Sequence, residues 1–220
     1  MEMSRLLVFD LDGTLVDTAP DLVNALNVAL AAERLDPIPL ARARDLIGAG
    51  ARALIERGLK LNNRTLPESR IDDLLQIFLT YYGQHIADHS RPYPGLDEQL
   101  MALGDQGWRF AICTNKIESY SVQLIEALRM RHWFEAICGS DTFAFKKPDP
   151  RHLTETIALA GGGPAIMVGD SNTDVATARA AGIPVIGVTF GYTDIPMRDL
   201  RPDALIEHFD DLGMAIHAVT

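Results

Sequence analysis

Three short apolar segments of this chain are each followed at once by polar side chains that can bind ions. The segments are residues 6–9, 109–113 and 165–168, and acidic, hydroxyl or amide groups come directly after each. Apolar runs of this length are typical of strands buried inside a parallel sheet. Because such sheets bind ligands beyond the carboxyl ends of their strands, we expect these polar residues to meet at one edge.

From residue 91 onward, strand-like segments alternate with segments of helical periodicity. Further strands are expected near 136–139 and 183–188, with a weak one near 204–206. The helices of this part are expected near 95–106, 117–130, 150–160, 172–181 and 209–217. The alternation predicts an α/β fold, in which a doubly wound, Rossmann-like parallel sheet is covered by helices on both faces.

Residues 16–90 interrupt this alternation. They show long helical periodicities and no convincing strand, so they predict an all-helical cap inserted after the first strand. The core domain would then comprise residues 1–15 and 91–220, and residues 91–95, which include two prolines, would form the second hinge.

Helices are expected inside the insertion, and one of them begins near Arg52. Thr18 is a candidate N-cap with Asp21 completing an approximate capping box, and this first helix should run to about Glu33. Residues 34–40 contain two prolines and predict a loop, and residues 67–87 predict another helix.

Asp10 and Asp12 follow the first apolar segment, two positions apart. In extended chain such residues point to the same face, where two carboxylates repel each other unless a cation or a shared proton compensates. Gly13 permits a sharp turn, and Thr14 adds a hydroxyl. The pattern indicates a divalent-cation site with one aspartate as nucleophile, although Asp-Gly is also common in ordinary turns.

The later segments add groups suited to phosphate. Thr114 and Asn115 offer a hydroxyl and an amide, and Lys147 lies before a proline, which favours extended backbone. Asp170 and Asp174 stand at the start of the helix expected over 172–181. Taken singly, these are a turn, a surface lysine and a helix N-terminus. Their common position after strands favours one shared site.

The ordered set resembles the four motifs of the haloacid dehalogenase superfamily. The motifs are Asp10-x-Asp12-Gly13-Thr14, Thr114-Asn115, Lys147-Pro148 and Gly169-Asp170-x-x-x-Asp174. Within the superfamily, the chain is similar to the phosphoglycolate phosphatase group. That similarity is carried by residues 9–20, by Leu46-Ile47-Gly48-x-Gly50 and by residues 187–192.

The resemblance implies a magnesium-dependent phosphatase. Asp10 would attack phosphorus to give an aspartyl-phosphate, and Asp12 would protonate the leaving alcohol and then activate water. Asp10, the backbone carbonyl of Asp12, and Asp170 would bind Mg²⁺.

The remaining motif residues receive supporting roles from the same resemblance. Thr114, Asn115 and Lys147 would hold the phosphoryl oxygens, while Asp174 would orient Lys147 or a metal-bound water. Gly13 and Thr14 would shape the loop around the metal.

An acid at Asp12 favours phosphatase or phosphomutase chemistry within the superfamily. The expected reaction is the hydrolysis of 2-phosphoglycolate to glycolate and phosphate. The alternatives are a phosphatase for a sugar phosphate or pyrophosphate, a sugar phosphomutase and a non-catalytic binding protein. Arg52 follows the Gly48-Ala49-Gly50 turn and could bind the substrate carboxylate, but a solvated helix arginine is an equal alternative.

Composition limits the kinds of molecule that this protein is expected to bind. A net charge of −10 argues against nucleic-acid binding, and no apolar window approaches the length of a membrane span. The N-terminus lacks the pattern of a signal peptide, so we expect a cytoplasmic monomer or homodimer acting on a small phosphorylated metabolite. Cys113 and Cys138 are expected to be buried thiols.

Overall fold

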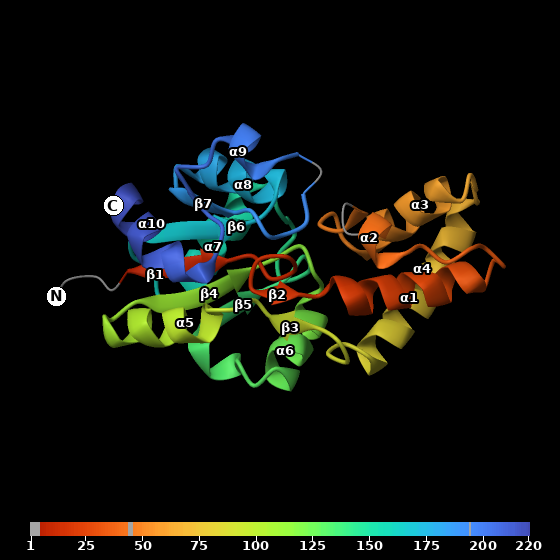
Figure 1. Cartoon of the computed structure of the whole chain (residues 1–220), viewed down its shortest axis with the longest axis horizontal. Helices are drawn as coiled ribbons and strands as arrows, with labels where there is room; N and C mark the ends of the chain where they lie inside the picture. The colour runs from red at the N-terminus through yellow and green to blue at the C-terminus, as the bar shows by residue number, and fades with distance from the viewer. Residues whose placement is uncertain (1–4, 44–45, 194) are drawn as a thin grey trace.

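The centre of the protein is a parallel sheet of six strands (Figure 1). The computed structural model describes residues 5–43, 46–193 and 195–220. The strand order is β5-β4-β1-β6-β7-β8. The strands are β1 (Leu6–Phe9), β4 (Arg109–Cys113), β5 (Phe134–Cys138), β6 (Ala165–Gly169), β7 (Val185–Val188) and β8 (Ala204–Ile206). The predicted α/β fold is confirmed.

Strand β1 occupies the middle of the sheet, and its register aligns the polar segments. Phe9 lies opposite Ile112 of β4 on one side and Val168 of β6 on the other. All four residues of β1 are fully buried, as expected for a strand covered on both faces. The chain segments that leave β1, β4 and β6 therefore emerge side by side at one edge.

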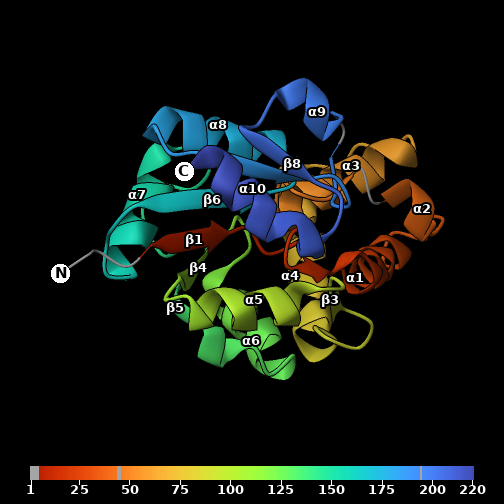
Figure 2. The same ribbon diagram turned by 60° about the vertical axis from the view of Figure 1, so that its left-hand side comes forward.

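Helices cover both faces of the sheet, and successive side chains of β1 point to opposite faces. Leu7 and Phe9 join one apolar cluster, whereas Leu6 and Val8 join the other. The first face is covered by α5 (Leu96–Asp105), α6 (Glu118–Ala127) and α10 (Leu212–Val219), which Figure 2 shows from the side of α10. The second is covered by α7 (Pro150–Leu159), α8 (Asn172–Ala181) and the short α9 (Met197–Leu200). Two 3₁₀ turns complete this part, η2 (Arg131–Trp133) and η3 (Phe209–Asp211).

The insertion is helical and forms a lobe beside the carboxyl edge of the sheet (Figure 1). Its helices are α1 (Ala19–Ala31), α2 (Leu40–Ala43), α3 (Ala51–Leu61) and α4 (Glu68–Gln84). We call these four helices and their connections the cap. The two chain crossings into the cap pair as a short antiparallel ladder, β2 (Val16–Asp17) with β3 (Arg91–Pro92).

The capping box expected at the first cap helix is wrong. Thr18 has φ −96° and ψ −6°, and its buried hydroxyl has no hydrogen-bond partner among the described residues. The carboxylate of Asp21 instead accepts hydrogen bonds from the backbone N–H groups of His89 and Ser90 and from the Ser90 hydroxyl. The helical backbone at Thr18 differs from the extended form that a capping side chain needs. Asp21 therefore ties α1 to the second crossing.

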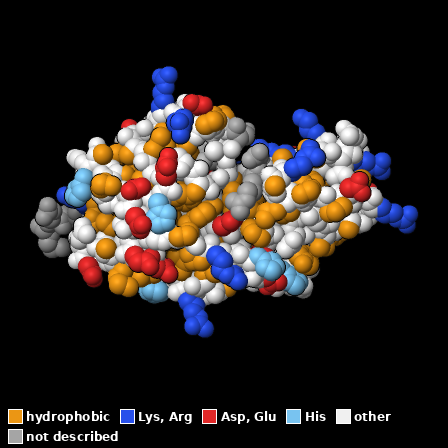
Figure 3. Space-filling model, in the orientation of Figure 1, with side chains coloured by type: hydrophobic (Ala, Val, Ile, Leu, Met, Phe, Trp, Pro, Cys, Tyr) orange, Lys and Arg blue, Asp and Glu red, His pale blue; other side chains and the backbone are white. Residues whose placement is uncertain are grey.

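Two features of the described residues bear on possible partners, namely the length of the helices and the place of the basic side chains. Among the residues that the structure describes, no helix is both long and apolar enough to cross a membrane. In Figure 3, the basic side chains of the described residues lie mainly at the margins of this face, and several of them gather on the right-hand lobe.

Candidate active site

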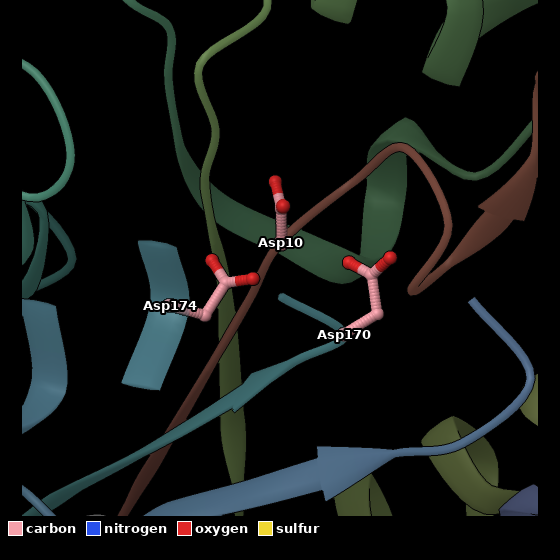
Figure 4. A group of neighbouring side chains, drawn as sticks. All are labelled: Asp10, Asp170 and Asp174. Carbon is pink, nitrogen blue, oxygen red and sulfur yellow. The ribbon is translucent and has the colours of Figure 1, made fainter. Parts of the chain in front are cut away.

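Three carboxylates converge at the carboxyl edge of the sheet (Figure 4). Asp10 follows β1, Asp170 follows β6, and Asp174 lies in the first turn of α8. One ligand oxygen from each lies within 4.8 Å of the others. Neighbouring parallel strands bring the first two together, as the sequence predicted.

Burial makes this acidic group unfavourable without a positive charge. Burial raises the pKa of Asp10 to about 6, against the opposing charge of Lys147. Burial, followed by the charges of Asp174 and Asp10, raises the pKa of Asp170 well above its ordinary value. A divalent cation would relieve this repulsion, and a set of oxygen donors suits a hard ion. The group therefore fits a divalent metal.

Lys147 supplies a fixed positive charge beside Asp10. Its side chain is 1% exposed, and Nζ lies 3.0 Å from Asp10 Oδ1 and 2.6 Å from Asp174 Oδ1. Burial lowers the pKa of Lys147, but the charges of Asp10 and Asp174 outweigh this and raise it above its ordinary value. Lys147 therefore remains charged at neutral pH.

The second oxygen of Asp174 is also engaged. Oδ2 accepts hydrogen bonds from the backbone N–H of Ser171, at 3.1 Å, and from the Ser171 hydroxyl, at 2.7 Å. This is the reciprocal cap of helix α8, which fixes the carboxylate in the first turn. Asp174 thus has the geometry of an anchor for Lys147.

Asp170 is held by the loop after β1 and by a loop after β7. Its Oδ1 accepts from the Thr14 hydroxyl at 3.0 Å, and its Oδ2 accepts from the backbone N–H of Tyr192 at 2.6 Å. Gly13 has φ +86°, and a Cβ there would lie 2.5 Å from Asp170 Oδ2. The turn therefore requires glycine both for its conformation and for space.

Thr114 and Asn115 emerge from β4 next to these carboxylates. Thr114 is buried, and its hydroxyl oxygen accepts from the backbone N–H of Lys116 at 3.2 Å, so its own proton remains to be donated. The Asn115 amide donates to the carbonyl oxygen of Lys147 at 3.1 Å. The second and third motifs are thereby linked through the backbone.

The sequence reasoning missed Lys116. Its side chain is 6% exposed, and Nζ lies 3.1 Å from Asp12 Oδ1 and 2.6 Å from the hydroxyl oxygen of Tyr82, a residue of cap helix α4. Burial lowers the pKa of Lys116, but Asp12 and Tyr82 outweigh this and raise it above its ordinary value. The available signal was its place directly after Thr114-Asn115 at a strand end.

A cavity of about 230 Å³ lies between the core and the cap. The core lines it with Asp10, Asp12, Thr114, Asn115 and Lys116, and the cap lines it with Gly48–Gly50, Arg52 and Tyr82. The Arg52 guanidinium is paired with carboxylates of its own lobe, those of Glu68 and Asp72.

Comparison with known proteins identifies the family. The model of the haloacid dehalogenase-like hydrolase family matches residues 7–188. The chain is 54% identical to a phosphoglycolate phosphatase of Mesorhizobium japonicum, over 97% of this chain and 96% of that protein. It is 50% identical to a phosphoglycolate phosphatase of Agrobacterium fabrum, with coverage of 97% and 93%.

A solved structure of a related protein has the same fold as this chain. The crystal structure of a predicted phosphoglycolate phosphatase from Haemophilus somnus superposes with a TM-score of 0.88 at 32% identity, covering 96% of this chain and 97% of that one. This protein belongs to the haloacid dehalogenase-like hydrolase family, as its motifs indicated.

Proposed function

We propose that this protein is a Mg²⁺-dependent phosphatase that hydrolyses 2-phosphoglycolate to glycolate and phosphate. The observation that carries the proposal is the position of Asp10, whose carboxylate lies 3.0 Å from the buried Lys147 ammonium in a small cavity. The names of its relatives support the substrate, since two of them are at least 50% identical over almost the whole chain.

In the first step, Asp10 acts as the nucleophile. One carboxylate oxygen attacks phosphorus, the bond from phosphorus to the ester oxygen breaks, and Asp12 gives its proton to the leaving glycolate oxygen. In the second step, Asp12 takes a proton from water as that water attacks phosphorus. The bond to Asp10 then breaks, which releases phosphate and restores both carboxyl groups.

The approach of a phosphate dianion to Asp10 is electrostatically unfavourable. Each pair of unit charges at about 4 Å contributes roughly 4 kcal/mol at an effective dielectric constant of about 20. Lys147 offsets part of this repulsion, and Asp174 keeps its ammonium in place. Asp10, Asp170 and the backbone carbonyl of Asp12 would hold Mg²⁺, which supplies the rest of the positive charge when it is bound. Thr114 and Asn115 would donate to phosphoryl oxygens.

We further propose that residues 16–90 act as a cap domain over a core of residues 1–15 and 91–220. The cavity lined by both parts supports this division, and the β2–β3 ladder marks where the chain crosses. A cytoplasmic location and a monomeric or dimeric state stay predictions from the sequence.

The test is phosphate release by purified protein with Mg²⁺ from a panel of phosphoesters. We expect the highest kcat/KM on 2-phosphoglycolate, above sugar phosphates and pyrophosphate. Asp10→Asn should remain folded and lose essentially all turnover, because an amide is a poor nucleophile. Substantial turnover by Asp10→Asn, or a clear preference for another phosphoester, would contradict the proposal.

A further inference from the structure

Lys116 is a buried cation that lines the cavity beside Asp12 and, among the described residues, has no ion pair with Asp10 or Asp174. We propose that its ammonium binds the carboxylate of the substrate, and that Tyr82 of the cap positions it for that contact. This inference rests on the proposed function, because it requires a substrate with a carboxylate next to the phosphoester.

The expected place of the substrate carboxylate follows from the proposed role of Asp12 as the acid that protonates the leaving group. To protonate the leaving group, Asp12 has to contact the ester oxygen of the substrate. In 2-phosphoglycolate the carboxylate carbon is two bonds from that oxygen. Since Lys116 Nζ lies 3.1 Å from Asp12 Oδ1, a cation at this place also reaches the carboxylate.

The other cations near the cavity are less well placed. Lys147 lies between Asp10 and Asp174, on the side where phosphate is expected. The guanidinium of Arg52 already pairs with Glu68 and Asp72 of the cap. Lys146 lines the cavity but is exposed, and no ion pair joins it to Asp12 among the described residues.

Tyr82 holds the ammonium from the cap side. Its hydroxyl oxygen accepts from Lys116 at 2.6 Å, and the ammonium lies 4.4 Å from the centre of its ring. Burial raises the pKa of Tyr82 to about 12, so the hydroxyl is neutral at physiological pH. Tyr82 is itself 2% exposed, stacked on Phe78 and set edge-on against Tyr120 of the core helix α6.

This arrangement makes the recognition of the substrate carboxylate depend on the position of the cap relative to the core. Both oxygens of Asp12 lie within 3.4 Å of Lys116 Nζ, so a substrate carboxylate can replace one of these contacts while Tyr82 keeps its own. The carboxylate-binding group therefore comes from the core, and the group that orients it comes from the cap. Complete discrimination requires both parts together.

The experiment compares kcat/KM for 2-phosphoglycolate with kcat/KM for 2-phosphoglycolamide, in which a neutral amide replaces the carboxylate. We expect Lys116→Met to lower this ratio about 10- to 100-fold, the usual worth of a hydrogen bond to a charged group. Tyr82→Phe keeps the cation and the ring, so it should lower the ratio only about two- to tenfold. Using the ratio cancels any effect on Asp12 that both substrates share.

Matched controls remove other cations and another hydroxyl. Lys146→Met, Arg52→Ala and Tyr120→Phe should leave the ratio within about twofold of wild type, as expected for positions without a direct contact to the carboxylate. Inhibition by the products gives a second measurement. The inhibition constant of glycolate should rise in Lys116→Met by the same factor as the ratio falls, while that of inorganic phosphate should stay unchanged.

Two outcomes would overturn the inference. One is an unchanged ratio in a folded Lys116→Met or, if that variant does not fold, in Tyr82→Phe. The other is a fall of the ratio in Lys146→Met or Arg52→Ala instead. Both are separate from failure of the proposed function, in which the wild-type protein itself would not prefer 2-phosphoglycolate.

Discussion

Asp174 lies close enough to Asp10 and Asp170 to be taken for a metal ligand, yet both of its oxygens are engaged elsewhere. Oδ1 is 2.6 Å from Lys147 Nζ, and Oδ2 accepts from Ser171. We therefore expect Asp174→Asn to weaken the anchoring of Lys147 and the fold, while leaving the affinity for Mg²⁺ nearly intact.

The magnitude follows from the buried pair. At 2.6 Å and an effective dielectric constant of about 20, the attraction between Asp174 and Lys147 is about 6 kcal/mol before the cost of burial is counted. Breaking a buried pair typically costs about 3–5 kcal/mol. Asparagine keeps one acceptor, and Asp10 still faces Lys147, so we expect the free energy of unfolding to fall by about 2–4 kcal/mol.

Asp170→Asn is the matched variant. For it we expect no loss of stability but a weaker affinity for Mg²⁺. The amide fits the same partners, because its oxygen can accept from the Tyr192 N–H and its nitrogen can donate to the Thr14 hydroxyl. Loss of the charge removes the cost of burying it and the repulsion by Asp174 and Asp10, which together raise the pKa of Asp170. The metal-free variant should be at least as stable as wild type, but should bind Mg²⁺ more than about 10-fold more weakly.

Urea unfolding of EDTA-treated protein and calorimetric titration with Mg²⁺ measure the two effects separately. In Asp174→Asn we expect an earlier unfolding midpoint, an unchanged slope and an affinity for Mg²⁺ within about threefold of wild type. Wild-type stability together with a loss of Mg²⁺ affinity above about 10-fold would refute the reasoning and make Asp174 a metal ligand.

Two further predictions concern the cofactor and the cap. EDTA should abolish phosphate release, Mg²⁺ should restore it and Ca²⁺ should inhibit it. The reason is that the sparse ligand set around a reacting phosphate suits a rigid octahedral ion. Full activity after exhaustive chelation would exclude a metal requirement. Asp21→Ala would leave the buried donors of His89 and Ser90 without their acceptor, so the free energy of unfolding should fall by about 3–5 kcal/mol in urea titrations. The exposed Asp97→Ala is its control and should stay within about 0.5 kcal/mol of wild type; equal midpoints for the two variants would contradict the role of Asp21.

The sequence by itself determined the sheet and the meeting of the residues that are expected to hold metal and phosphate. Each strand is a short apolar run, and this local pattern does not depend on distant contacts. Asp10, Thr114 and Asp170 each follow such a run, and parallel strands end at the same edge, so their proximity followed from topology. Gly13 was recognisable for the same local reason, since a strand that turns sharply favours glycine.

Only the tertiary structure decided how the cap meets the core. Lys116 contacts Asp12, 104 positions earlier, and Tyr82, 34 positions earlier, and no local periodicity encodes such contacts. Asp21 was expected to cap its own helix, but it bonds residues 68 and 69 positions away. A long charged or hydroxyl side chain can reach many partners, and the packing of cap helices on the core selects among them. Local sequence therefore placed the groups expected to hold metal and phosphate, whereas the fold placed the group proposed to select the substrate.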